Sequence, residues 1–177
     1  MRNQTEKIVL SGLFIAIGVI LPSLFHAAGI GQQISPMHFP ALLAGVILGW
    51  KYGLAVGLLT PLLSGLMFGM PPLFPTATVM SLELGTYALI SGIITEKVKP
   101  FKNQIYNIYL GLLVAMILGR IVYGISYAVI MGISGETYGF RVYISSVLLQ
   151  TWPGIILQFL VIPPIVVLYQ KRLKNPS

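Results

Sequence analysis

Residues 8–28 of the chain have the sequence IVLSGLFIAIGVILPSLFHAA, without a single charged side chain. A helix needs about 20 mainly apolar residues to cross the hydrocarbon core of a bilayer, so this stretch is long enough to span a membrane. It is also longer than the apolar region of a cleavable signal peptide, which has about 7–15 residues, and no clear cleavage site follows it. We therefore interpret it as the first membrane helix.

The composition of the whole chain supports the same conclusion. The chain has 177 residues, of which 56% are hydrophobic and only 8% are charged, and its mean hydropathy is +0.88. Soluble domains have about 25% charged residues, so this chain lacks the polar side chains that would cover a water-facing surface. The sequence predicts an all-α integral membrane protein in which residues 1–177 form a single domain.

Further apolar runs predict six helices. Two of them, 37–50 and 52–68, are short, because fourteen residues at about 1.5 Å each reach about 21 Å, less than a hydrocarbon core of about 30 Å. These two are either short spans in a locally thin region or a deep helical hairpin, and we favour six helices. The expected helices cover residues 8–28, 37–50, 52–68, 74–95, 106–133 and 147–168.

The basic residues indicate the topology. With 11 Lys and Arg against 4 Asp and Glu, the net charge is +7. In the six-helix arrangement every basic residue except Arg120 and Arg141 lies on one side of the membrane. The positive-inside rule therefore predicts that both termini are cytoplasmic, and the charge needs no nucleic-acid partner. The residues on the basic side are Arg2, Lys7, Lys51, Lys97, Lys99, Lys102, Lys171, Arg172 and Lys174.

Missing motifs exclude several classes of function. The chain has no cysteine, which excludes thiolate metal sites and cysteine nucleophiles. It also lacks the G-x-x-x-x-G-K-[ST], H-E-x-x-H and G-x-S-x-G patterns, so it cannot itself cradle the phosphates of ATP, and nothing pairs a nucleophile with a base. We expect no catalytic residue, no metal and no cofactor.

Two ionisable residues, Glu83 and Arg120, fall inside expected spans. A charge at the centre of a membrane helix costs roughly 2.5–3.5 kcal/mol. We expect the two residues at similar depth on consecutive antiparallel helices, where they either form a structural ion pair or line a cavity that binds a polar solute.

Polar neighbours favour the cavity. Tyr and Gln side chains at the same depth need partners for their polar atoms, and a ligand would supply them. His38 and Gln33, at the first outer loop, could cap such a cavity. The expected substrate-binding residues are Glu83, Tyr87, Arg120, Tyr123, Tyr127, Gln158, His38 and Gln33.

Small residues at four-residue spacing allow helices to approach closely in lipid. Most of these ladders are interpreted as packing faces within the subunit. Gly12 and Ala16 lie near the cytoplasmic end of the first helix, where a contact with another subunit is more plausible.

One long stretch resembles a known family. The segments MHFPALLAG (37–45), GWKYG (49–53), TPLLS (60–64) and FGMPPLFP (68–75) are similar to the substrate-binding S component of an energy-coupling factor (ECF) transporter. Glu83-Leu84 and Tyr87 continue the similarity, which covers residues 8–97; the remainder agrees in length and topology.

The resemblance implies a six-helix subunit of the bacterial cell membrane that captures a vitamin from outside. Such a subunit works with a transmembrane T component and two cytosolic ATPases, and transport would involve toppling of the S component in the membrane. In the family, the first helix contacts the T component through an Ala-x-x-x-Ala pattern. Gly12 and Ala16 correspond to this pair, with a departure at the first position.

The sequence alone does not identify the substrate, and it leaves two alternative functions open. Arg120 suits a carboxylate, as in pantothenate, because a guanidinium binds carboxylates bidentately. Glu83 with aromatic neighbours suits an aminopyrimidine or a pyridine, as in hydroxymethylpyrimidine or pyridoxine. The alternatives are a self-sufficient secondary transporter, although no internal repeat relates residues 1–88 to 89–177, and an assembly subunit without a ligand.

Overall fold

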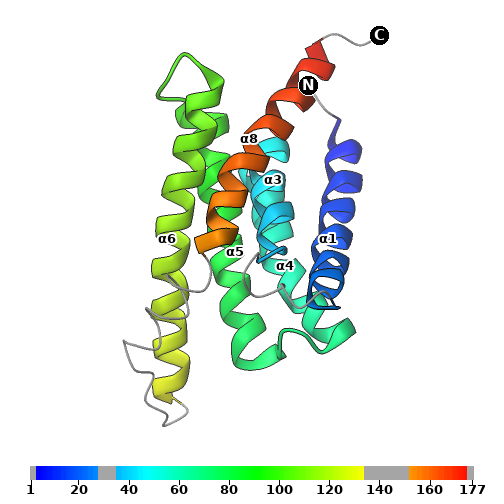
Figure 1. The fold of residues 1–177 in the computed structure, drawn as a ribbon, viewed down its shortest axis with the longest axis vertical. Coiled ribbons are helices and arrows are strands. Elements are labelled where there is room, and N and C mark those ends of the chain that lie inside the picture. Colours follow the sequence, from blue (N-terminus) through cyan, green and yellow to red (C-terminus); the bar gives the residue numbers. More distant parts are fainter. Residues whose placement is uncertain (1–2, 28–34, 134–151, 175–177) are drawn as a thin grey trace.

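The computed structural model describes residues 3–27, 35–133 and 152–174, and none of these residues belongs to a strand. The described chain forms a bundle of helices (Figure 1), which confirms the all-α prediction. Two short helical turns, η1 and η2, extend α5 at its two ends. The elements are α1 (Gln4–Ala27), α3 (His38–Leu48), α4 (Trp50–Phe68), η1 (Leu73–Ala77), α5 (Thr78–Ile93), η2 (Ile94–Val98), α6 (Gln104–Ile133) and α8 (Trp152–Lys174).

Five segments of the described chain are long and apolar enough to cross a membrane. The helix α3 is shorter, because its 11 residues reach only about 17 Å at about 1.5 Å per residue. Two helices were predicted to be short, and only α3 is. Helix α4 has 19 residues and is long enough to cross a membrane. The five segments are Gln4–Phe25, Trp50–Phe68, Leu73–Val98, Gln104–Gly132 and Trp152–Arg172.

The boundary between α3 and α4 lies at Gly49, and this explains the longer α4. Gly49 has a φ of 90°, a conformation that residues with a side chain rarely adopt. The helix therefore stops at Leu48 and a new one begins at Trp50. Lys51, which the sequence pattern placed between the helices 37–50 and 52–68, lies in the first turn of α4.

The short helix α3 lies in the core of the bundle. Eight of its 11 residues are buried, and it packs against α1, α4, α5 and α8. Leu42 and Val46 of α3 contact the main hydrophobic cluster, to which α5, α6 and α8 also contribute. This packing holds His38, the first residue of α3, inside the bundle at 4% exposure. The other buried members of the cluster are Tyr87, Ile108, Leu112, Ala115, Met116, Ile162 and Val166.

The first and the last described helix have their outer ends at the same end of the bundle. In Figure 1, α1 begins and α8 ends at the top, where the α5–α6 connection also lies. Trp50, at the start of α4, is tied to this end because its backbone N–H donates to Glu96 Oε2 at 3.3 Å. Lys97 and Lys51 place their Nζ atoms 4.7 and 5.4 Å from the centre of the Trp50 ring. The even number of crossings and the cytoplasmic position of the termini, which the basic residues predict, both stay predictions.

Helices α4 and α5 approach each other through glycine. A Cβ atom on Gly57 would lie 2.6 Å from the carbonyl carbon of Leu84 and 2.7 Å from the nitrogen of Gly85. Such distances are shorter than any real contact of a Cβ, so the backbones can come this close only where no side chain intervenes. The small-residue face over 53–57 is therefore a packing face inside the subunit.

Replacing Gly57 with alanine should destabilise the bundle. The new methyl group meets backbone atoms of α5, which cannot move aside as a side chain would, and overpacking of this kind costs roughly 1–3 kcal/mol. Gly12→Ala is the matched control, because a Cβ on Gly12 has nothing within 4 Å. The check is thermal unfolding of both purified variants in detergent. Equal melting temperatures for the two variants would contradict the close α4–α5 contact.

Candidate functional site

Glu83 lies on α5 within the apolar segment Leu73–Val98 and is 1% exposed. A carboxylate in this position has lost its hydration and must be stabilised by protein donors or neighbouring charges. The surroundings of Glu83 therefore decide whether the chain tolerates it.

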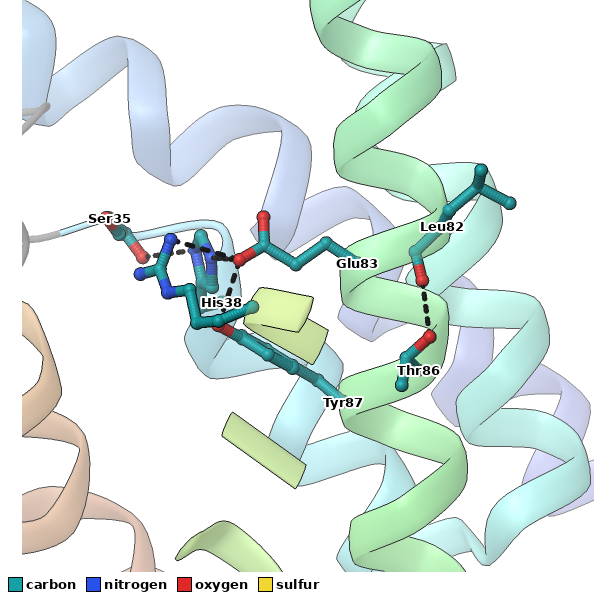
Figure 2. Close-up of polar contacts among 7 residues, drawn as sticks. Ser35, His38, Leu82, Glu83, Thr86 and Tyr87 are labelled. Atoms are coloured by element: carbon teal, nitrogen blue, oxygen red, sulfur yellow. Dashed lines mark hydrogen bonds and ion pairs between the residues drawn. The ribbon is translucent and has the colours of Figure 1, made fainter. Parts of the chain in front are cut away.

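Three side chains converge on one oxygen of this carboxylate (Figure 2). The hydroxyl of Tyr87 donates a hydrogen bond to Glu83 Oε1 at 2.9 Å. Arg120 Nη1 lies 3.1 Å from the same atom, and His38 Nε2 lies 3.7 Å from it. These partners come from α5, α6 and α3, so Glu83 connects three helices that are far apart in the sequence. We call the four residues the Glu83 cluster.

The second carboxylate oxygen has different surroundings. Figure 2 shows that Glu83 Oε2 points away from the three partners, and within the described parts of the chain no donor hydrogen-bonds to it. A carboxylate has about four lone-pair positions. The cluster therefore neutralises the charge but leaves acceptor capacity on one side of the carboxyl group.

His38 is held in place from two directions. Its Nδ1 atom lies 3.2 Å from the carbonyl oxygen of Ser35, just before α3, and its ring centre lies 5.3 Å from that of Tyr87. The sequence prediction had His38 capping a cavity from above. The structure instead buries it beside Glu83, because α3 is packed in the core.

The ring of Tyr87 has room because α6 has a glycine opposite it. A Cβ atom on Gly119 would collide with Cδ1 and Cε1 of this ring, and Tyr87 is only 1% exposed. The glycine thus lets the tyrosine stand between α5 and α6 with its hydroxyl directed at Glu83. The spacing of small residues on α6 was a signal for this contact, but it did not identify the aromatic partner.

The other predicted residues lie outside the Glu83 cluster. Tyr123 and Tyr127 are half-buried on α6, with ring centres 5.7 Å apart, and neither is among the three partners of Glu83 Oε1. Gln158 on α8 is 2% exposed, and its Oε1 has no hydrogen-bond partner among the described residues. Buried polar atoms are nearly always paired, so Gln158 has an unused acceptor. Gln33 lies outside the described residues.

The predicted partner-binding pair lies on the periphery. Gly12 and Ala16 are exposed on α1, whose other face packs on the bundle through Gly18 and Val19. Neither residue is near the Glu83 cluster, so the two predicted surfaces are separate. Within the described ranges, no group of three or more His, Cys, Asp or Glu side chains could hold a metal ion.

A comparison with known protein families identifies the class of protein to which the chain belongs. The sequence profile of the family described as "ECF transporter, substrate-specific component" matches residues 6–166, which include every member of the Glu83 cluster. The chain belongs to this family. No curated protein and no solved structure gives a significant match. The chain is thus the substrate-binding subunit of a transporter, a multi-pass membrane protein of a class that works with a T component and ATPases.

The contact between Gly119 and Tyr87 can be tested in this S component. Gly119→Ala should destabilise the fold by roughly 1–3 kcal/mol, because the methyl group displaces a buried ring that is also hydrogen-bonded to Glu83. Gly111→Ala on the same helix is the control, since its nearest neighbour would be 3.4 Å from the new Cβ, an ordinary contact. Thermal unfolding in detergent measures both. A Gly119→Ala protein as stable as the control would refute this placement of Tyr87.

Proposed function

We propose that this S component binds a small, neutral, water-soluble vitamin or vitamin precursor at the Glu83 cluster. It would capture the compound from outside the bacterial cell, and partner ATPases would energise uptake. The observation that carries the proposal is the buried Glu83 carboxylate, which has three partners on Oε1 and, among the residues that the structure describes, no hydrogen-bond donor on Oε2. A ligand that donates a hydrogen bond to Oε2 would give the second carboxylate oxygen a partner as well.

A purely structural ion pair explains less of this arrangement. Burying an ion pair is often no better for stability than burying apolar residues of the same volume, because both charges lose their hydration. Here the carboxylate recruits a tyrosine and a histidine in addition to Arg120. Arg120 also keeps 15% of its side chain exposed, so a solute can reach it. Both features favour a binding site over a structural contact.

The charge balance indicates the class of substrate. Glu83 and Arg120 lie 3.1 Å apart and cancel each other's charge. A carboxylate ligand such as pantothenate would have to compete with Glu83 for the guanidinium and leave a buried negative charge without its partner. A neutral ring with an amino or hydroxyl donor avoids this cost. We therefore favour a pyridine or aminopyrimidine, as in pyridoxine or hydroxymethylpyrimidine, over pantothenate.

Nearby aromatic rings are consistent with a flat ligand. The Tyr123–Tyr127 pair continues along α6 from Arg120, and the His38–Tyr87 pair lies beside Glu83 Oε1. Aromatic groups stack in offset or tilted arrangements with gains of about 0.5–1.5 kcal/mol beyond area burial. Ring contacts would thus add affinity, while Glu83 would set the orientation.

Alanine variants of the charged pair separate binding from structure. Glu83→Ala and Arg120→Ala should fold and should weaken binding of the best compound in a vitamin panel at least tenfold, about 1.4 kcal/mol. The double variant should show no rescue, because each residue supports the ligand. Glu96→Ala is the control: it removes a carboxylate at the other end of α5, where Glu96 accepts the N–H of Trp50. Calorimetry or thermal shift with pyridoxine, hydroxymethylpyrimidine and pantothenate provides the measurement.

Two outcomes would refute parts of this proposal. If each single variant loses roughly 3–5 kcal/mol of stability and the double variant recovers it with normal ligand affinity, the pair is structural only. If pantothenate binds more tightly than the two neutral rings, the site binds a substrate but the assignment of its class is wrong.

We also propose that the exposed face of α1 at Gly12 and Ala16 contacts the T component. Both residues are exposed, and a Cβ on Gly12 has nothing within 4 Å, so the backbone of a partner helix can approach this face closely. Neighbouring apolar side chains on α1, among them Val9 at 65% and Leu13 at 54% exposure, are open to the membrane.

Tryptophan substitutions test this surface. Gly12→Trp or Ala16→Trp should abolish uptake in cells that contain the T component and ATPases, yet leave substrate affinity of the purified subunit within about twofold of wild type, since the ring projects away from the bundle. Gly18→Trp serves as the contrast and should unfold, because a Cβ there would lie 2.5 Å from the Thr60 methyl group. If the substrate affinity of the purified subunit falls as much as uptake does, the Gly12 face packs inside the subunit.

A further inference from the structure

Helices α6 and α8 enclose an open groove near the end of the bundle that has the α5–α6 connection. Its volume is about 460 Å³, within the range of roughly 300–1,000 Å³ that is usual for small-molecule sites. The lining is almost entirely apolar and aromatic. The residues are Phe101, Tyr106, Tyr109, Leu110, Leu113 and Phe159.

The groove is open to the surroundings of the bundle. Tyr109 of α6 and Phe159 of α8 stack across it, with ring centres 6.2 Å apart and planes only 7° from parallel. Leu113 beside them is 48% exposed, and Tyr106 nearer the connection is 60% exposed. Because α6 and α8 are membrane segments, the groove faces the hydrocarbon core, where the available apolar occupants are lipid chains.

The mouth of the groove is rigid. Phe101 is fixed by Asn107, a residue of α6 that is 1% exposed. The Asn107 side chain accepts a hydrogen bond from the Phe101 backbone N–H at 2.9 Å and donates one to its carbonyl oxygen at 2.8 Å. The two bonds hold the connection against α6, so the Phe101 ring stays at the groove, edge-on to Tyr106 at 6.0 Å.

Positive charge without a carboxylate partner adjoins this mouth. Lys99 and Lys102 flank Phe101 in the chain, and both are exposed. Among the described residues, neither forms a salt bridge with a carboxylate, and the nearest acidic residue in sequence, Glu96, accepts the N–H of Trp50. A mobile anion would therefore be attracted to the same place at which the apolar groove opens.

We propose that this groove binds an anionic phospholipid, with one acyl chain along the Tyr109–Phe159 stack and the headgroup phosphate at Lys99 and Lys102. The combination of an apolar channel and a basic mouth matches the two halves of such a lipid. Aromatic side chains are enriched at membrane interfaces, and basic pockets between membrane helices on the cytoplasmic side bind anionic headgroups. The site is separate from the Glu83 cluster and does not depend on the proposed substrate.

Native mass spectrometry of the purified full chain tests this site. The protein in detergent is mixed with phosphatidylglycerol or phosphatidylcholine, and the fraction carrying one retained lipid is measured. Wild type should retain phosphatidylglycerol preferentially. The double variant Lys99→Gln/Lys102→Gln should lose about fivefold in apparent affinity for each lysine removed. Lys171→Gln/Arg172→Gln is the matched control, because it removes the same charge from exposed positions of α8 outside the groove lining.

A second variant tests the apolar half of the site. Leu113→Trp would fill the groove, and the exposure of Leu113 lets the fold accept it; retention of both lipids should fall at least fivefold, while the melting temperature of the lipid-free protein stays unchanged. Equal retention of the two lipids by wild type would overturn the proposal. So would an equal loss in the control double variant, full retention by Leu113→Trp, or competition by inorganic phosphate alone.

Discussion

A carboxylate inside a membrane span is tolerated only where the protein replaces its hydration, and at Glu83 that replacement comes from three helices. Tyr87 is on the same helix, whereas Arg120 and His38 come from α6 and α3. The contacts of Arg120 and His38 connect α6 and α3 to α5, whereas the Tyr87 contact lies within α5. The apolar packing of α3 against α5, α6 and α8 places His38 within reach of the carboxylate.

Much of the architecture could be predicted from the sequence because lipid imposes simple rules. Apolar length indicates which segments are long enough to span, whereas the direction that lysine and arginine predict stays a prediction. The short α3 was predicted for the same reason. The length of α4 was not predicted, because the break between α3 and α4 depends on the backbone conformation of Gly49, whereas the sequence pattern placed this break at Lys51.

The site was predictable only in part. Glu83 and Arg120 stand out in any membrane span because charge there is costly, and Tyr87 follows Glu83 by one helical turn. The depth of His38 was not predictable, since it depends on how α3 packs rather than on its own residues. Likewise, the role of Gly119 depends on a ring from another helix, and no local pattern specifies which side chain will occupy such a space.

The brevity of α3 has a mechanical consequence. The helix begins at His38, beside the carboxylate, and ends at Leu48, just before Gly49, where Glu96 lies against the backbone. An 11-residue α-helix is a stiff rod of about 17 Å. A shift of His38 along the axis of α3 would therefore also move the Gly49–Trp50 junction at the opposite end. Helix α3 thus connects the Glu83 cluster directly with the end of the bundle at which α1 begins and α8 ends.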